Sequence, residues 1–231
     1  MDCVYICRSG DNEELRYSIR SVVKNLPHAR IWVVGYKPDW YQGNFISVEN
    51  ASSKFKNISN ALRVVCDSDE ISEDFVLMND DFFILKPLDS MPNFIGGTLS
   101  EKIAEYRKID PRSRYANILD DTNIYLMKNG IDVPIDYDLH VPMTMNRKSL
   151  KSVITDEAFP RSTYGNFFLS GGQKIDDVKA YSGSSSLRQR SVNLKNDLAF
   201  VSTEDKSFDH IYKTFLVNEF TEPSEYERTL H

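Results

Sequence analysis

The hydrophobic positions in the first half of the chain follow two different spacings. Four short, mostly apolar runs are typical of buried strands: residues 2–7 (DCVYIC), 31–35 (IWVVG), 45–48 (FISV) and 75–78 (FVLM). Between them, two segments have helical spacing, one through Leu15, Ile19, Val22, Val23 and Leu26 and one over residues 58–65. The order strand, helix, strand, strand, helix, strand predicts an α/β fold with a mostly parallel sheet and flanking helices.

Polar residues predict where the first helix begins and ends. Asp11 precedes the apolar stripe, and Glu14 follows it by three residues, which is the spacing of a capping box. Pro27 is expected to end the same helix because proline cannot continue the backbone hydrogen bonding. The residues between the first strand and this helix, RSGDN, therefore lie at the carboxyl end of a strand.

The second half of the chain is less regular. Residues 115–128 have helical spacing and end before Gly130, and residues 147–154 predict a short helix. The Pro-flanked segment 132–143 is predicted to be extended, and residues 181–190 form a Ser-rich loop. A late strand over residues 197–202 leads into a last helix with an apolar side: Phe208, Ile211, Tyr212, Phe215 and Leu216. We expect one domain over residues 1–231, with a C-terminal helical and extended subregion.

Composition narrows the class of protein. With 231 residues, 41% hydrophobic and 27% charged, the chain is long enough and apolar enough to bury a core. A net charge of −6 disfavours binding of nucleic acid through bulk electrostatics. Three cysteines are too few for a disulfide framework, no secretion signal follows Met1, and no apolar run approaches the length of a membrane span. These features predict a cytoplasmic protein with no membrane partner.

The most distinctive chemistry lies in residues 75–85 (FVLMNDDFFIL). Asp80 and Asp81 stand between two apolar blocks, directly after a predicted strand. Ligands gather at the carboxyl ends of strands in parallel sheets, and an Asp pair there suits Mg²⁺ or Mn²⁺ shared with a diphosphate. The alternative is a tight turn between two hairpin strands, for which Asn-Asp is ordinary turn chemistry.

Arginines and a histidine add further candidates. Arg16 and Arg20 share one face of the first helix, and Arg8 ends the first strand, so all three are suited to phosphate binding. A solvated helix face is the alternative for the first two. His140 lies near Asp138 in the extended segment, and a histidine beside a carboxylate can accept a proton from a hydroxyl. A buried structural histidine is the alternative.

Several segments together resemble the Stealth family of sugar-phosphate transferases. The similar blocks are DNEELRYSIRSV (residues 11–22), NISNALR (57–63), FVLMNDDFF (75–83), a His-x-Pro at 140–142 before NRKSLKSVI, and DLAFVSTED (197–205). The family's usual opening, a tryptophan followed by a short acidic motif, is replaced here by CRSGD. Residues 162–172 (STYGNFFLSGG) also resemble small phage-encoded glycosyltransferases, so a phage-encoded protein in a bacterial host is one expected source.

The resemblance implies a glycosyltransferase-A-like fold, a nucleotide-sugar cleft and a role for each matched residue. Residues 1–95 would form the nucleotide-sugar-binding half and residues 96–231 the acceptor and catalytic half. The implied donor contacts, some as alternatives to structural roles, are Arg8, Asp11, Asn12, Arg16, Arg20, Asn57, Ser59, Arg161, Tyr164 and Asn166. Asp80 and Asp81 would hold Mn²⁺ or Mg²⁺, with Asp205 as a late ligand or a sugar contact. His140, Asp138 and Asp81 are the implied catalytic residues. For the run FPRSTYGNFF, a surface turn pivoting on Gly165 is the alternative.

These residues predict a metal-dependent transferase that moves a sugar from a nucleotide-diphosphate sugar to an acceptor hydroxyl. An alternative with the same donor is transfer of sugar-1-phosphate, as in Stealth enzymes, and a second is a sugar-binding module without turnover. The acceptor is open among a glycan, a protein, a small molecule and a hydroxymethylated DNA base. The sequence leaves the oligomeric state open as well.

Overall fold

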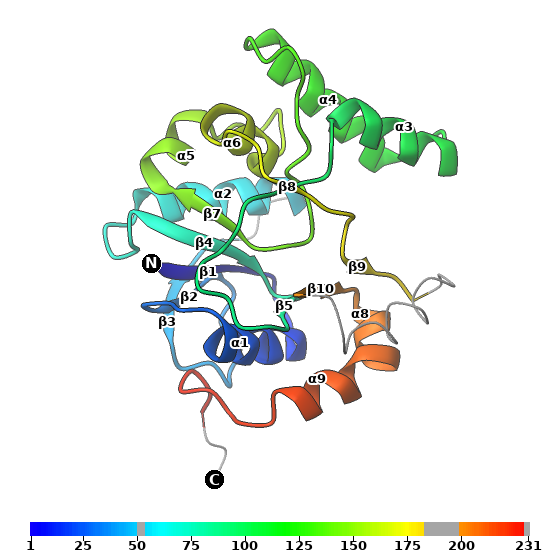
Figure 1. The fold of residues 1–231 in the computed structure, drawn as a ribbon. Helices are drawn as coiled ribbons and strands as arrows, with labels where there is room; N and C mark the ends of the chain where they lie inside the picture. Colours follow the sequence, from blue (N-terminus) through cyan, green and yellow to red (C-terminus); the bar gives the residue numbers. More distant parts are fainter. Residues whose placement is uncertain (50–53, 183–198, 229–231) are drawn as a thin grey trace.

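A computed structural model describes residues 1–49, 54–182 and 199–228. Within these residues, the central sheet has five strands in the order β3-β2-β1-β4-β7 (Figure 1). Their bounds are Asn44–Ser47 (β3), Ile31–Gly35 (β2), Asp2–Cys7 (β1), Asp74–Asn79 (β4) and Met143–Asn146 (β7). The first four strands are parallel to their neighbours, and only β7 runs antiparallel, beside β4. The predicted α/β fold with a mostly parallel sheet is confirmed.

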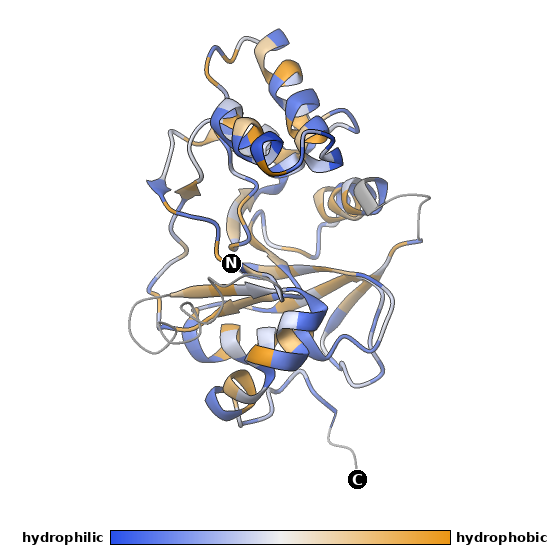
Figure 2. Cartoon of the chain, turned by 90° about the vertical axis from the view of Figure 1, so that its right-hand side faces the viewer, coloured by the Kyte–Doolittle hydropathy of each residue, from blue (hydrophilic) through white to orange (hydrophobic). Residues whose placement is uncertain are grey.

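Helices cover both faces of this sheet. Helix α1 (Glu13–Asn25) packs on one face, where alternate β1 residues such as Tyr5 meet Ile19. Helices α2 (Lys54–Asp67) and α5 (Arg147–Val153) cover the other face, where Val4 meets Leu62. Figure 2 shows the consequence, with hydrophobic colour concentrated on the strands between the helical layers. The two-residue period of β1 therefore supplies both halves of the core.

The chain changes sheets at the acidic motif. A second sheet has the order β5-β10-β9, formed by Phe82–Ile84 (β5), Phe200–Thr203 (β10) and Lys179–Ala180 (β9). Strand β5 pairs antiparallel with β10, whereas β4 pairs with β1 and β7. Asp80 and Asp81 connect these two sheets, so they do not form the turn of a β4–β5 hairpin. The hairpin alternative is wrong, because each strand finds its partners elsewhere.

The remaining elements surround the sheets. They are β6 (Phe94–Ile95), α3 (Leu99–Ile109), α4 (Arg114–Lys128), α6 (Pro160–Phe168), β8 (Gln173–Lys174), α8 (Asp205–Ser207), the π-helix η1 (Phe208–Tyr212) and α9 (Lys213–Glu219). Helices α3 and α4 pack on each other through a small core of their own that includes Leu99 and Leu119. None of the helices in the described ranges has the length and apolar character needed to cross a membrane.

Several sequence-based expectations are confirmed and others are corrected. Strands β1 and β2 have the predicted bounds, and α4 begins one residue before the prediction. The predicted capping box is wrong: Asn12 is the N-cap, in a left-handed conformation, and its side chain makes no capping bond. Helix α3 was not predicted, although Thr98 and Glu101 form a complete capping box there. The Ser-rich loop lies outside the described residues from position 183 onward.

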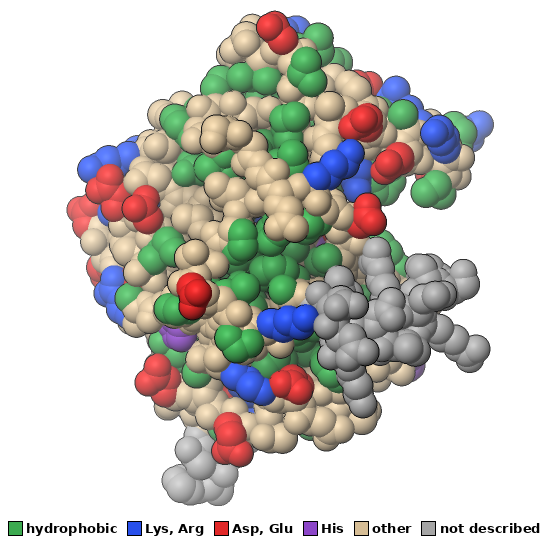
Figure 3. Space-filling model, in the orientation of Figure 1, with side chains coloured by type: hydrophobic (Ala, Val, Ile, Leu, Met, Phe, Trp, Pro, Cys, Tyr) green, Lys and Arg blue, Asp and Glu red, His purple; other side chains and the backbone are tan. Residues whose placement is uncertain are grey.

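Charged side chains are mixed over the visible surface. On the face drawn in Figure 3, the Lys and Arg side chains of the described residues alternate with Asp and Glu. This face therefore presents interspersed charges of both signs rather than a continuous basic surface, in keeping with the overall net charge of −6.

Candidate functional site

A cavity of about 1160 Å³ opens at the carboxyl ends of three parallel strands. The last residues of β1, β2 and β4, which are Cys7, Gly35 and Asn79, line it. Gly35 is required there, because a Cβ in its place would lie 2.4 Å from the carbonyl oxygen of Cys7. The opposite wall comes from α4, from the loop that contains His140 and from the start of α6. The strand exits therefore face a cavity, as the parallel topology leads one to expect.

Asp80 is the buried carboxylate of the acidic motif. Its side chain is only 16% exposed, and its nearest cation is Nε of Arg8, 3.9 Å from Oδ2. Within the described residues, that Oδ2 atom accepts no hydrogen bond. Burial and the neighbouring charge of Asp81 raise the pKa of Asp80 to about 6, although the charge of Arg8 opposes this shift.

Asp81 is held by a lysine from the second sheet. The ammonium of Lys179 contacts the Asp81 carboxylate and the carbonyl oxygen of Thr203. Oγ of Ser202 also donates to Oδ2 of Asp81, over 3.1 Å. Both charged side chains are largely buried, with 12% exposure for Lys179 and 14% for Asp81. The parallel pairing of β9 with β10 fixes this arrangement, because it aligns Lys179 with Ser202.

Asp205 and Arg8 form the outer part of the same centre. Nη2 of Arg8 lies 2.6 Å from Oδ1 of Asp205, and both side chains are mostly exposed. Arg8 therefore stands between two carboxylates, those of Asp80 and Asp205. The three predicted metal ligands thus all line the cavity.

The arrangement of these carboxylates does not fit a preformed metal site. Asp81 is engaged by Lys179 and Asp205 by Arg8, so each faces a cationic side chain. Across residues 1–49, 54–182 and 199–228, the acidic, cysteine and histidine side chains form no group of three or more that could hold a metal ion. Metal binding by Asp80, Asp81 and Asp205 stays a prediction.

His140 lines the cavity and has a carboxylate partner. Its Nδ1 lies 2.9 Å from Oδ1 and 2.8 Å from Oδ2 of Asp177, and its backbone N–H also donates to Oδ1. Burial alone would raise the pKa of Asp177, but the hydrogen bonds and charge of His140 outweigh burial and lower it to about 2. The His140 ring packs nearly perpendicular to the ring of Phe82, which follows the acidic motif directly.

Arg161 holds the backbone on both sides of His140. Its Nη1 donates to the carbonyl oxygens of Leu139 and Val141, over 3.1 and 2.7 Å, and its guanidinium stacks on Phe82. Burial lowers the pKa of Arg161 to about 10. The predicted site residue Arg161 therefore lines the cavity, but its guanidinium donates to the protein's own backbone carbonyls. It positions the loop that contains His140.

Two further acidic side chains in the cavity, Glu14 and Asp138, have strongly raised pKa values. Burial is the main cause for both, and each pKa is about 7. Asp138 accepts a hydrogen bond of 2.5 Å from Oγ of Ser162, and the charge of Asp136 adds to its shift. Glu14 accepts a hydrogen bond of 2.6 Å from Oγ1 of Thr203. Glu14 thus contacts the second sheet instead of capping its own helix.

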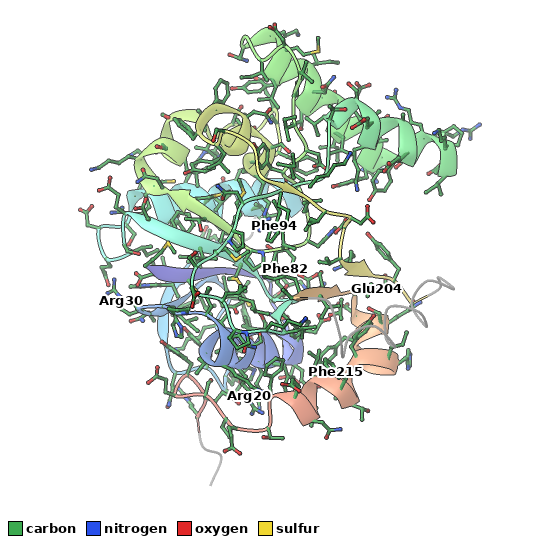
Figure 4. All side chains as sticks on the ribbon, viewed as in Figure 1. Arg20, Arg30, Phe82, Phe94, Glu204 and Phe215 are labelled. Carbon is green, nitrogen blue, oxygen red and sulfur yellow. The ribbon has the colours of Figure 1, made fainter. Side chains whose placement is uncertain are left out.

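The predicted donor contacts Arg16 and Arg20 do not reach the cavity. Nε and Nη2 of Arg20 each lie 2.7 Å from a carboxylate oxygen of Glu227, and its Nη1 donates to the carbonyl oxygen of Phe220. Arg16 stacks on Trp40, and its Nε lies 3.8 Å from Glu227. Figure 4 shows Arg20 beside the C-terminal segment, away from Glu204 at the end of β10. The two arginines therefore connect the C-terminal segment to α1 through their contacts with Phe220 and Glu227.

The aromatic and amide side chains predicted as sugar contacts lie outside the cavity lining. Residues 160–168 form helix α6 instead of a turn, and neither Tyr164 nor Asn166 lines the cavity. The Tyr164 hydroxyl accepts a hydrogen bond from the backbone N–H of Asn146. Asn166 exchanges two 2.8 Å hydrogen bonds with the backbone of Ile135. Both side chains satisfy backbone groups of neighbouring segments.

The other predicted donor contacts lie around the cavity. Asn57 and Ser59, in the first turns of α2, line it directly. Asp11 and Asn12 line a shallower hollow of about 370 Å³ next to it, which shares Arg8 and Asp205 with the main cavity. Nδ2 of Asn12 donates to Sγ of Cys7 and to the carbonyl oxygen of Arg8, so this residue shapes the strand exit.

Sequence reasoning missed Asp177, Lys179 and Glu14. A signal for the first two exists in IDDVKAY (residues 175–181), where an acid and a lysine are two positions apart in an extended segment. Side chains at that spacing point to the same face, so both can reach one site. Glu14 had no such signal, because the capping-box spacing explained it completely.

Comparison with known proteins gives distant similarities only. No family model matches the chain, and no curated protein matches it. Among solved structures, it is similar to the apo form of the glycosyltransferase GlyE from Streptococcus pneumoniae TIGR4, with 10% identity and a TM-score of 0.41. That alignment covers 98% of this chain and 65% of GlyE. Mouse xyloside xylosyltransferase 1 in its apo form aligns with 8% identity, a TM-score of 0.39, and coverage of 98% and 96% respectively.

Proposed function

We propose that this protein is a transferase that moves a sugar from a nucleotide-diphosphate sugar to an acceptor hydroxyl. The observation behind the proposal is that one large cavity contains both a histidine–carboxylate pair, His140 and Asp177, and a charged centre around Asp80 and Asp81. The histidine can accept a proton from a hydroxyl, and the cations of the charged centre, Arg8 and Lys179, can neutralise a phosphate group. The cavity volume of about 1160 Å³ is large enough for a ligand of nucleotide-sugar size.

The contact with Asp177 prepares His140 to act as a general base. A carboxylate at Nδ1 favours the tautomer with the proton on that nitrogen, so Nε2 is left as the proton acceptor. The same carboxylate stabilises the imidazolium that forms when Nε2 takes up the proton of the acceptor hydroxyl. The hydroxyl oxygen then forms a bond with the anomeric carbon. The bond from that carbon to the diphosphate oxygen breaks, and its electron pair leaves with the nucleoside diphosphate.

A panel of nucleotide sugars tests this proposal. Thermal shift and calorimetry should identify one base and sugar that bind, and incubation of that donor with acceptor mixtures should release a nucleoside diphosphate. Release of a nucleoside monophosphate would instead assign sugar-1-phosphate transfer. Binding with neither product would support a sugar-binding module. Failure of every nucleotide sugar to bind would overturn the proposal.

A further inference from the structure

The cations around the acidic motif are side chains of the protein. Lys179 lies on Asp81, and Arg8 lies between Asp80 and Asp205. Every carboxylate that the sequence suggested as a metal ligand therefore already has a cationic neighbour. A leaving diphosphate needs positive charge nearby, and this centre contains two sources of it.

Lys179 is fixed in place by its surroundings. Its ammonium contacts the Asp81 carboxylate and the Thr203 carbonyl oxygen, and its side chain is only 12% exposed. A divalent ion bound to Asp81 would lie next to this buried ammonium, and two cations at that distance in a poorly solvated site repel each other strongly. The Lys179 ammonium therefore occupies the position where a cation on Asp81 would be expected.

The side chain of Arg8 is exposed, so it can change its orientation more easily than the buried side chain of Lys179. It lies at the exit of β1, and its pair with Asp205 is largely exposed, so exchanging that partner requires little free energy. A guanidinium can bind two phosphate oxygens at once. Arg8 can thus turn from Asp205 to a diphosphate in the cavity while Asp80 keeps it near the strand exit.

We propose that Arg8 and Lys179 together neutralise the diphosphate of the donor and of the leaving nucleotide, so that the protein binds this group without a divalent metal ion. The inference rests on the proposed function. When the bond from the anomeric carbon breaks, the electron pair stays on the diphosphate oxygen, and the two side-chain cations stabilise the charge there. His140 holds the proton from the acceptor.

Calorimetry with uridine, guanosine, adenosine and cytidine diphosphates tests the inference on metal-stripped protein, with EDTA or with Mn²⁺. We expect at least one of them to bind with affinities that agree within about threefold in the two conditions. Arg8→Met and Lys179→Met should each weaken that binding by about tenfold to a hundredfold. Lys24→Met, which removes an exposed cation paired with Glu219 outside the cavity, is the matched control for net charge.

Binding that disappears with EDTA and returns with Mn²⁺ would overturn the inference and leave the proposed function standing. Unchanged affinity in Arg8→Met would overturn it as well, and that variant alters a side chain that is 63% exposed. If none of the four diphosphates binds in either condition, and no nucleotide sugar does, the proposed function fails and the inference fails with it.

Discussion

Nδ1 of His140 lies 2.8 Å from one carboxylate oxygen of Asp177 and 2.9 Å from the other, although the two residues are 37 positions apart in the chain. The loop before β7 supplies the histidine, and the segment before β9 supplies the carboxylate. Their meeting requires the second sheet to dock beside the first. The pair therefore depends on tertiary structure, and it connects the loop before β7 to the strand that contains Lys179.

Asp177→Asn should lower turnover while leaving donor affinity nearly unchanged. The amide can still accept a hydrogen bond, but it lacks the charge that stabilises an imidazolium, and we expect a loss of about tenfold to a hundredfold in kcat. The pH dependence of the rate should also shift, which a purely structural role would not produce. Steady-state kinetics over pH check this, and an unchanged pH profile together with an unchanged kcat would contradict it.

Arg161→Lys should reduce turnover by distorting the loop around His140. An ammonium cannot span the carbonyl oxygens of Leu139 and Val141 with the planar geometry of a guanidinium. We expect a fall in kcat of about tenfold with little change in donor Kd. Arg107→Lys, at an exposed pair with Asp120, is the control. A weaker donor Kd with normal kcat would mean that Arg161 contacts the donor instead.

Arg20→Ala should destabilise the fold and leave donor binding intact. The change removes the nearest cation of the buried Glu227 carboxylate, and breaking a buried ion pair costs about 3 kcal/mol. Chemical denaturation gives the stability and calorimetry the affinity. The double variant Arg20→Met, Glu227→Gln should recover part of the loss, because it removes both charges. A large loss of donor affinity at unchanged stability would instead mean that Arg20 contacts the donor.

Glu14→Gln should remove a loss of folding stability that the wild-type protein shows as pH rises. Burial raises the folded-state pKa of Glu14 from its usual value of 4.5 to about 7. Protonated Glu14 contributes to the free energy of unfolding. This contribution is fully present below pH 4.5, and it is lost as pH rises through the folded-state pKa of about 7. One pKa unit corresponds to about 1.4 kcal/mol, so near pH 8 the shift from 4.5 to about 7 leads us to expect that the variant is more stable than wild type by about 3 kcal/mol.

Denaturation of wild type and Glu14→Gln near pH 4 and near pH 8 checks this expectation. The two proteins should have similar stability at the lower pH, where the wild-type carboxyl is protonated. Glu105→Gln, an exposed change on α3, should show no difference at either pH. Equal stability of wild type and Glu14→Gln at both pH values would contradict the assignment.

Local spacing accounts for the part of the fold that the sequence predicted correctly. Alternating apolar residues such as Tyr5 and Val4 determine which face of β1 meets which helix, and the order of elements then determines a mostly parallel sheet. The position of Asp80 and Asp81 at a strand exit follows from the same local reasoning. Local reasoning could not predict that these two residues connect two different sheets, because β5 pairs with β10, more than a hundred residues later in the sequence.

Long-range partners account for what the sequence could not predict. Helical periodicity places Arg16 and Arg20 on one face of α1, but it does not reveal that the C-terminal segment covers that face. Glu14 has the spacing of a capping residue, yet it accepts a hydrogen bond from Thr203, which connects α1 to the second sheet. In each case a local pattern fixed the orientation of a side chain, and the docking of a distant segment decided its partner.

We propose that His140, held by Asp177, accepts the proton of the acceptor in a cavity that binds a nucleotide sugar. The most direct measurement compares donor Kd and the rate of nucleoside diphosphate release in wild type and His140→Asn. We predict the same donor Kd within about threefold and a rate lower by about a hundredfold to ten-thousandfold, since the asparagine cannot take up the proton. An unchanged rate in a folded His140→Asn protein would contradict the claim.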